Sequence, residues 1–461
     1  MLNITKRNMI TMVIKKIPVG ALFVLISIIA AVYPFIILLA IAIGLCIILA
    51  DTLLKRITQF LFAIVAIAAI FGPYLSFPGM GGLFLFRIVL LLHFVLFLFE
   101  KKDWQFLKAI KVPLLAIGSW IGFSIVTLIW SQDLQLSLRA IYFQLESFYL
   151  IFLVVYYVRQ MQDLKKLLYW IIPPFLLSIG VGCYEMFTGN HLWYSSLAGK
   201  GYPDYRPTGL LTNTNDFSSY LSIYFPLFIY LLFQKNMWWR WLIALSSMGI
   251  LFFLVVASES RTGLLAFGIM LLLLIIKLFS KLISGILLFI GINLVSIFLL
   301  VMQLIGKQEF GYLVGKETST DQRLLIYETG LNVAKESHFL GVGIGVVPNY
   351  IFQALYGTVN IPDDMQQTMS AHNFWLATLA DVGILGLCCV LFFFIWLLVY
   401  ACRQFVNEKG LLTGTSLSIL IAFVAISIGS SSIFEMRVVW LGVGIALAIV
   451  HLNLRKKEEK I

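Results

Sequence analysis

Three polar side chains at the mouths of apolar segments have the types and positions that chemistry on an anionic substrate requires. Arg206 begins the sequence Arg-Pro-Thr-Gly just before an apolar stretch, and Arg261 lies at the tip of a tight hairpin between two others. His372 stands where a long polar loop re-enters apolar sequence. Guanidinium groups present planar forks of donors that suit phosphate oxygens, and an imidazole can share a proton at neutral pH. The combination indicates proton transfer beside a bound phosphate.

Each of these residues also has a structural interpretation. Arg206 could reach lipid head groups as an interfacial arginine, and Arg261 could complete its turn by pairing with Glu259. A single histidine is more often structural than catalytic, and as a functional group His372 could act as a base or bind substrate. A functional role for Arg206 is favoured because the polar residues that follow it enter an apolar stretch, which is costly unless they line a wet cavity: Asn213, Asn215 and Asp216.

Further candidates for substrate binding stand near these residues or in similar surroundings: Arg323, Asn213, Asn215, Asn373 and Arg437. Arg323 heads the segment 321–337, in which apolar and polar residues alternate with an imperfect helical period. This pattern predicts a helix that lies on the membrane or packs over the bundle. Its apolar residues would be Leu324, Leu325, Tyr327, Leu331 and Val333.

Charged residues inside or beside apolar stretches need partners. Glu146 is predicted to pair with an arginine such as Arg139 or to join a polar relay, whereas Glu435 and Arg437 could form a solvated pair at a turn. The glycine run at residues 341–345 lacks the strand–helix context and the acidic partner of a nucleotide-binding motif. Tight packing of this loop is the favoured interpretation.

The elements that position these side chains are predicted to be membrane-spanning helices. The chain has 461 residues, 61% of them hydrophobic, with a mean hydropathy of +0.97, which points to lipid as its main solvent. A span needs about 20 apolar residues, and short paired helices use fewer. We predict an all-α, polytopic helix bundle of about 14 spans: residues 18–33, 35–50, 57–75, 83–99, 112–130, 141–158, 167–187, 213–233, 241–257, 262–276, 282–305, 373–401, 411–429 and 438–452.

The distribution of basic residues predicts the orientation of this bundle. With fourteen spans, 23 of the 33 lysine and arginine residues fall on the side that carries both termini. The positive-inside rule therefore places both termini in the cytoplasm and a large loop, residues 306–371, outside. One helix in place of the first two spans would invert this order. The simplest division of residues 1–461 is a single integral membrane domain.

Composition also excludes several classes of function. The net charge of +11 reflects topology and attraction to anionic lipid, so nucleic-acid binding is not expected. The five cysteines lie in or at the ends of predicted spans and suggest neither disulfides nor a metal site: Cys46, Cys183, Cys388, Cys389 and Cys402. No cofactor motif is visible.

Four segments in order resemble the O-antigen ligase and O-antigen polymerase superfamily. They are RPTGLLTNTNDFSSYLSIYFPLFIYLL, SESRTGLLAFGIMLLLL, DQRLLIYETGLNVAKESHFLGVGIG and AHNFWLATLADVGILGL, and together they cover about residues 200–400. The resemblance implies an inverting, metal-independent glycosyltransferase at the outer face of the bacterial cytoplasmic membrane. It matches Arg206 and Arg261 to the family's arginines, His372 to its essential histidine and Arg323 to a further arginine.

The donor implied by this resemblance is a glycan on a polyprenyl diphosphate. Its partners would be the lipid bilayer and the flippase and chain-length regulator of the same pathway. The favoured function is a polymerase that joins repeat units into a capsule, O-antigen, exopolysaccharide or teichuronic acid. Two alternatives stay open: a ligase that moves a finished glycan to a lipid or protein, and a flippase or transporter of lipid-linked oligosaccharide, for which inverted repeats would be expected.

Overall fold

The computed structural model describes residues 51–77, 80–234, 237–287, 289–290, 293, 317–357, 373–429 and 433–458. The predicted spans at 18–33 and 35–50, most of the span at 282–305, and His372 lie outside these residues. The chain divides into two compact units, one of Met1–Phe62 with Val89–Lys102 and the other of Ala63–Ile88 with Asp103–Ile461. Every contact discussed below lies within the second unit.

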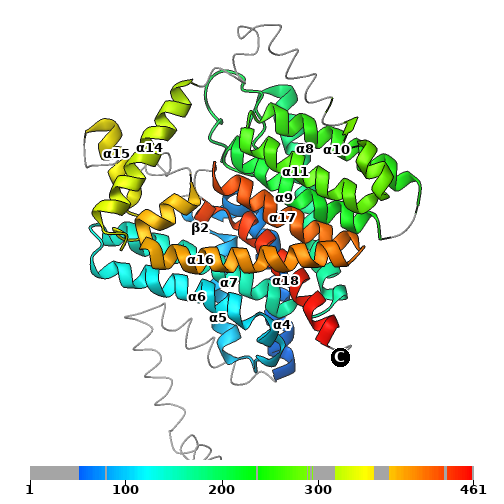
Figure 1. The fold of residues 1–461 in the computed structure, drawn as a ribbon, viewed down its shortest axis with the longest axis horizontal. Helices are drawn as coiled ribbons and strands as arrows, with labels where there is room; N and C mark the ends of the chain where they lie inside the picture. The colour runs from blue at the N-terminus through cyan, green and yellow to red at the C-terminus, as the bar shows by residue number, and fades with distance from the viewer. Residues whose placement is uncertain are drawn as a thin grey trace, which may run out of the picture. The chain divides into compact units, whose positions relative to one another are not determined.

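The described part of the chain is built of helices, as predicted (Figure 1). They are α4 (Asp51–Phe71), α5 (Leu85–Phe99), α6 (Lys111–Val126), α7 (Leu134–Tyr157), α8 (Met161–Thr188), α9 (Thr214–Leu232), α10 (Trp239–Ala257), α11 (Arg261–Leu278), α14 (Glu317–Glu336), α15 (Val347–Tyr356), α16 (Phe374–Asn407), α17 (Leu411–Ser427) and α18 (Arg437–Glu458), with the short 3-10 helices η1 (Gly72–Leu75), η2 (Gln105–Ile110), η3 (Thr127–Ile129) and η4 (Ile433–Glu435). A small antiparallel ribbon of β1 (Ser76–Phe77) and β2 (Met80–Phe84) joins η1 to α5.

Among the described residues, eight helices are long and apolar enough to cross a membrane. They occupy Leu53–Leu75, Gln105–Ile129, Leu134–Tyr157, Met161–Thr188, Trp239–Ala257, Arg261–Leu278, Phe374–Asn407 and Arg437–Lys456. The helices α5 and α17 are apolar but shorter. Helix α9, whose first turns carry Asn215 and Asp216, is not among these helices, although it too lies on a predicted span. The chain is therefore a polytopic helical membrane protein.

Helix α18 forms the centre of the second unit. Its residues from Val438 to Val450 are buried almost without exception, and α7, α9, α16 and α17 all pack against it. The longest helix, α16, runs beside α6 (Figure 1). Aromatic rings fill the junction of α16, α17 and α18, where Phe394 stacks on Phe423 with ring centroids 4.2 Å apart. This core fixes the ends of the helices that carry the polar residues.

A break in α16 anchors the loop that follows α14. Gly383 has a φ of 83°, and a Cβ there would lie 2.5 Å from the carbonyl oxygen of Phe339. The buried carboxylate of Asp381 accepts hydrogen bonds from the backbone N–H groups of Val346 and Val347, at 3.1 and 3.0 Å. The glycine run is thus packed tightly against α16, as the sequence predicts.

Helix α14 covers the segment in which an amphipathic helix is predicted, and it packs over α16 and α15. Its buried face contains Ile326, Val333 and Ala334. Of the apolar residues expected on this helix, Val333 is buried and Tyr327 packs partly against the core, whereas Leu324, Leu325 and Leu331 are exposed. The imperfect helical period could not tell which of the leucines would meet the bundle.

Candidate functional site

Four helices begin at the same end of the second unit. A Cβ on Gly263 in the first turn of α11 would meet Ser218 in the second turn of α9, and Trp375 of α16 donates a hydrogen bond to Ser427 at the end of α17 over 2.8 Å. The ring of Phe374 lies 5.3 Å from that of Phe434, just before α18. Because Asp216 of α9 and Arg437 of α18 also line one cavity, the first turns of α9, α11, α16 and α18 lie together. Backbone N–H groups and helix dipoles at these N-termini favour anions.

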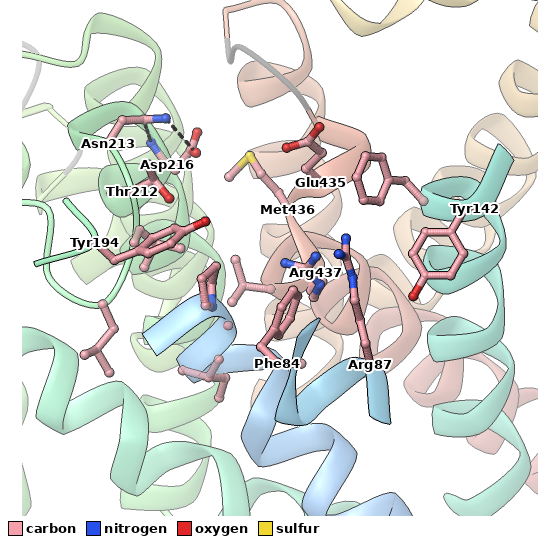
Figure 2. Close-up of a pocket in the computed structure, with 18 of the residues that line it drawn as sticks. Phe84, Arg87, Tyr142, Tyr194, Thr212, Asn213, Asp216, Glu435, Met436 and Arg437 are labelled. Carbon is pink, nitrogen blue, oxygen red and sulfur yellow. Dashed lines mark hydrogen bonds between the residues drawn. The ribbon is translucent and has the colours of Figure 1, made fainter. Parts of the chain in front are cut away.

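A cavity of about 590 Å³ opens at this end of the unit (Figure 2). Its walls come from the β1–β2 region, α5, α7, the loop before α9, and the start of α18. Arginine, acidic, amide and aromatic side chains line it together: Phe84, Arg87, Arg139, Tyr142, Phe143, Tyr194, Thr212, Asn213, Asp216, Glu435 and Arg437. A cavity of this size with a few convergent polar groups is typical of a ligand site.

Two arginines that line the cavity share one carboxylate, that of Glu146. Nε of Arg87 donates to Glu146 over 3.0 Å, while Nη2 of Arg437 lies 3.6 Å from the other oxygen of the same carboxylate. Both guanidinium groups also lie over the ring of Phe84, at 4.7 and 4.4 Å from its centroid. The ring and Glu146 hold the two cations in place.

A third arginine belongs to the same wall. Nη2 of Arg139 lies 3.8 Å from the carboxylate of Glu435. Burial raises the pKa of Glu435 above its ordinary value, and the nearby Arg139 and Arg437 oppose this shift. Glu146 pairs with arginines, as predicted, but they are Arg87 and Arg437 rather than the expected Arg139. The expected pair of Glu435 and Arg437 is not the one found, because Glu435 pairs with Arg139.

The opposite wall is the N-terminus of α9. Asn213 caps this helix, because its side-chain oxygen accepts from the N–H of Asp216 over 2.8 Å. Its Nδ2 donates to the carboxylate of Asp216, also over 2.8 Å (Figure 2). Thr212 and Tyr194 lie beside them in the lining. This wall thus offers a carboxylate, an amide and a hydroxyl at one helix end.

Arg206 lies in the loop before α9, outside the lining of the cavity. Its guanidinium binds Asp204 through Nε and Nη2, at 2.9 and 2.6 Å, and lies 3.8 Å from Glu259 in the α10–α11 turn. These hydrogen bonds raise the pKa of Arg206 and hold that of Asp204 well below its usual range. The contact with Glu259 brings Arg206 to the turn that carries Arg261.

The buried carboxylate of Glu185 stabilises the turn that follows Arg206. Glu185 at the end of α8 accepts hydrogen bonds from the N–H groups of Thr208 and Gly209, at 2.6 and 2.7 Å. Nδ1 of His191 lies 3.2 Å from the same carboxylate, and its Nε2 lies 2.7 Å from the carbonyl oxygen of Asp204. Because buried N–H groups need partners, Glu185 fixes the conformation of the turn.

The remaining predicted residues have varied surroundings. Arg261 is the exposed first residue of α11, directly after the cap residue Ser260. Asn373 caps α16, and its side-chain oxygen accepts from Trp375 and Leu376. The backbone oxygen of Asn215 accepts from the hydroxyl groups of Ser218 and Ser219, and Arg323 is half-buried on α14. All four residues lie outside the lining of the cavity.

The structure therefore brings Asn213 and Arg437 to one cavity and places Arg206 near the turn of Arg261. Sequence reasoning did not assign Arg87 to the site, although an arginine inside an apolar span was the available signal. Tyr142 and Tyr194 carried no such signal. In the described part of the chain, no group of three or more His, Cys, Asp or Glu residues could hold a metal ion.

Comparisons with known proteins agree with this architecture. Residues 246–391 match the family model described as O-antigen ligase. The chain is also 27% identical over 407 residues to the teichuronic acid biosynthesis protein TuaE of Bacillus subtilis (strain 168). The aligned region covers 82% of this chain and 81% of that protein. Arg261, Arg323, His372 and Asn373 fall within the family match. The resemblance predicted from the sequence is confirmed: the chain is a polytopic helical membrane protein similar to O-antigen ligases and to a protein of teichuronic acid biosynthesis.

Proposed function

We propose that this protein is a membrane glycosyltransferase that joins polyprenyl-diphosphate-linked glycan units into a cell-surface polysaccharide. One observation carries the proposal: Arg206 reaches the turn that carries Arg261, and the loop from Arg206 into α9 also lines, through Thr212 and Asn213, a cavity with three further arginines. A lipid diphosphate at the bilayer surface can be reached only by groups at the mouths of spans. Arg206 and Arg261 have that position.

The proposed reaction breaks the bond between the sugar C1 and the donor diphosphate and forms a bond to an acceptor hydroxyl. Negative charge grows on the leaving diphosphate, and the guanidinium groups of Arg206 and Arg261 stabilise it. His372 takes the proton from the acceptor hydroxyl as the new bond forms. Attack from the face opposite the diphosphate inverts the configuration at C1. No step requires a metal ion.

For Arg206, the contact with Asp204 sets a condition on donor binding. The carboxylate of Asp204 accepts hydrogen bonds from Nε and Nη2 of Arg206, two of the N–H groups that would face a diphosphate. Its presence keeps the guanidinium oriented, while Nη1 lies at a longer distance of 3.8 Å from Glu259. A diphosphate therefore binds through the remaining donors or by replacing one of these carboxylates.

The orientation in the bacterial cytoplasmic membrane belongs to the same proposal. Both termini lie in the cytoplasm and the α14–α15 segment lies outside, because most basic residues fall on the terminal side. A cysteine replacing the exposed Gln353 of α15, in a background without native cysteines, should react with an impermeant thiol reagent on intact cells. Gly357 is a poorer site because its φ of 70° would strain a cysteine. Labelling only after lysis would reverse the orientation.

A ligase is the second candidate, favoured by the family description O-antigen ligase, whereas the TuaE relative is named only as a teichuronic acid biosynthesis protein, which fits either activity. Deletion of the gene followed by sizing of the surface glycan separates them. Single repeat units in the mutant identify a polymerase. Full-length chains that stay on the polyprenyl carrier identify a ligase. An unchanged surface glycan would refute both.

A further inference from the structure

The cavity has a charge distribution of its own, distinct from that of the Arg206 turn. At one end the guanidinium groups of Arg87, Arg139 and Arg437 face two carboxylates, those of Glu146 and Glu435. Three cations against two anions leave this end positive. Figure 2 shows the amide and carboxylate of Asn213 and Asp216 at the opposite end.

Within this positive end, Arg437 has unused capacity to bind a ligand. Its side chain is only 12% exposed. Its Nε is buried and has no hydrogen-bond partner among the residues that the structure describes. The nearest carboxylate oxygen, on Glu146, is 3.6 Å from Nη2, which is longer than a good charge-assisted hydrogen bond. A buried donor without a partner is costly, so an acceptor from a ligand would stabilise this arrangement.

The opposite end sets a limit on the charge of that ligand. A diphosphate carries several negative charges, and in this cavity it would meet Asp216 as well as the arginines. A sugar ring with one carboxylate meets both ends favourably, since its hydroxyl groups can donate to Asp216 and accept from Asn213. The aromatic rings of Tyr142 and Tyr194 in the walls offer apolar surface for the faces of such a ring.

We propose that this cavity is an acceptor subsite for an acidic sugar, with the carboxylate on the guanidinium of Arg437 and the ring hydroxyls on Asp216 and Asn213. The inference rests on the proposed function, because it takes the donor diphosphate to lie at Arg206 and Arg261. The N-terminus of α9 separates the two sites: Asp216 faces the cavity, whereas Ser218 faces α11. One enzyme thus holds two anionic groups apart.

Binding of simple sugars to the purified full chain in detergent micelles tests this subsite. The probes are methyl glucuronide and methyl galacturonide, each compared with the methyl glucoside or galactoside that has CH₂OH in place of the carboxylate. Saturation-transfer NMR reports dissociation constants in the millimolar range that such small probes require. Inorganic pyrophosphate is added as a competitor to represent the donor.

The wild type should bind at least one uronide about 10-fold or more tightly than its neutral counterpart. Arg437→Gln should weaken uronide binding by about 10- to 100-fold, as expected for loss of a buried charge-assisted hydrogen bond, and leave the neutral sugar unaffected. Arg139→Gln tests the same end of the cavity. Arg139 pairs with Glu435 and its side chain is 44% exposed, so this substitution leaves the buried Arg87–Glu146 pair intact. Arg403→Gln, at the far end of α16, is the matched control.

Equal binding of the uronides and their neutral counterparts to the wild type would overturn the proposal, and so would a uronide preference that survives both arginine substitutions. Displacement of the uronide by pyrophosphate, with loss of pyrophosphate binding in Arg437→Gln, would instead assign the cavity to the donor. Transfer from a lipid-linked glycan is measured separately. If the wild type transfers without preferring uronides, the subsite alone is refuted; if it never transfers, the proposed function fails.

Discussion

Gly263 controls how closely α11 approaches α9 beside the arginine turns. A Cβ at this position would lie 2.5 Å from Cβ of Ser218 and closer still to its Oγ. Ser218 is buried, so it has little room to move. Since overpacking of this kind costs about 1–3 kcal/mol, Gly263→Ala should lower stability by that amount or push the two helices apart.

Gly268 in the same helix is the matched control. A Cβ there would meet nothing within 4 Å, so Gly268→Ala should be neutral or stabilise by up to about 1 kcal/mol through its helix propensity. Replacement of Ser218 by Gly removes both clashing atoms. The double variant Gly263→Ala with Ser218→Gly should therefore recover most of the lost stability.

The apparent unfolding temperature in detergent micelles and the rate of glycan transfer report these effects together. Arg261 lies two residues before Gly263, so a displaced helix also moves this arginine, and transfer should fall more in Gly263→Ala than in Gly268→Ala. Equal behaviour of the two alanine variants would show that the close approach of α9 and α11 is not required. Failure of Ser218→Gly to rescue would assign the loss to another cause.

Two further predictions concern the charged groups. Arg206→Ala and Arg261→Ala should each abolish most transfer while the protein still accumulates in membranes, and the lysine variants should recover only part, because lysine keeps the charge without the planar fork; full activity in both lysine variants would show that charge alone suffices. Burial raises the pKa of Glu435 in the folded protein, so its carboxyl group becomes neutral as pH falls through this raised pKa. The protonated carboxyl group therefore stabilises the folded protein fully below the ordinary pKa of glutamate, and this stabilisation is lost as pH rises through the raised pKa of the folded state. Uronide binding should tighten over the same fall in pH, and Glu435→Gln should remove the dependence; an unchanged pH profile in that variant would contradict the assignment.

The helical segments were predictable because lipid imposes a long apolar run on each span. The four segments that resemble the O-antigen ligase and polymerase superfamily also predicted which loops would carry the polar groups, and the last three of them lie within the family match to residues 246–391. Pairing of charges was not predictable. Glu146 contacts arginines 59 and 291 residues away in sequence, and a sequence pattern carries no signal for such contacts.

The Arg206 turn shows a second limit of sequence reasoning. The motif predicted a functional arginine, and the structure adds the buried Glu185 that shapes its turn and the Asp204 that binds its guanidinium. Glu185 lies near the end of α8, the preceding helix, and the sequence alone does not distinguish it from the other charged residues in predicted spans. Its role depends on the backbone N–H groups that the fold brings to it, and these are invisible in the sequence.

His372 provides the most direct test of the proposed chemistry. It precedes Asn373, the residue that caps α16 at the end where the arginine-bearing helices begin, and it lies within the residues that match the O-antigen ligase model. A general base typically contributes about 10²- to 10⁴-fold to a rate, so His372→Ala should lose transfer by that factor while donor binding persists. An imidazole that only bound substrate would instead raise KM.

Purified protein supplied with a lipid-diphosphate glycan should form product in the presence of EDTA, since the proposed charge stabilisation comes from arginines rather than a metal ion. His338, exposed in the turn after α14, is the internal control, and His338→Ala should lose far less activity. If EDTA stops the wild type, a metal ion takes part and the arginine-based mechanism is wrong. If His372→Ala and His338→Ala are equally active, the acceptor hydroxyl loses its proton to another group, and the base must be sought among the residues that line the cavity.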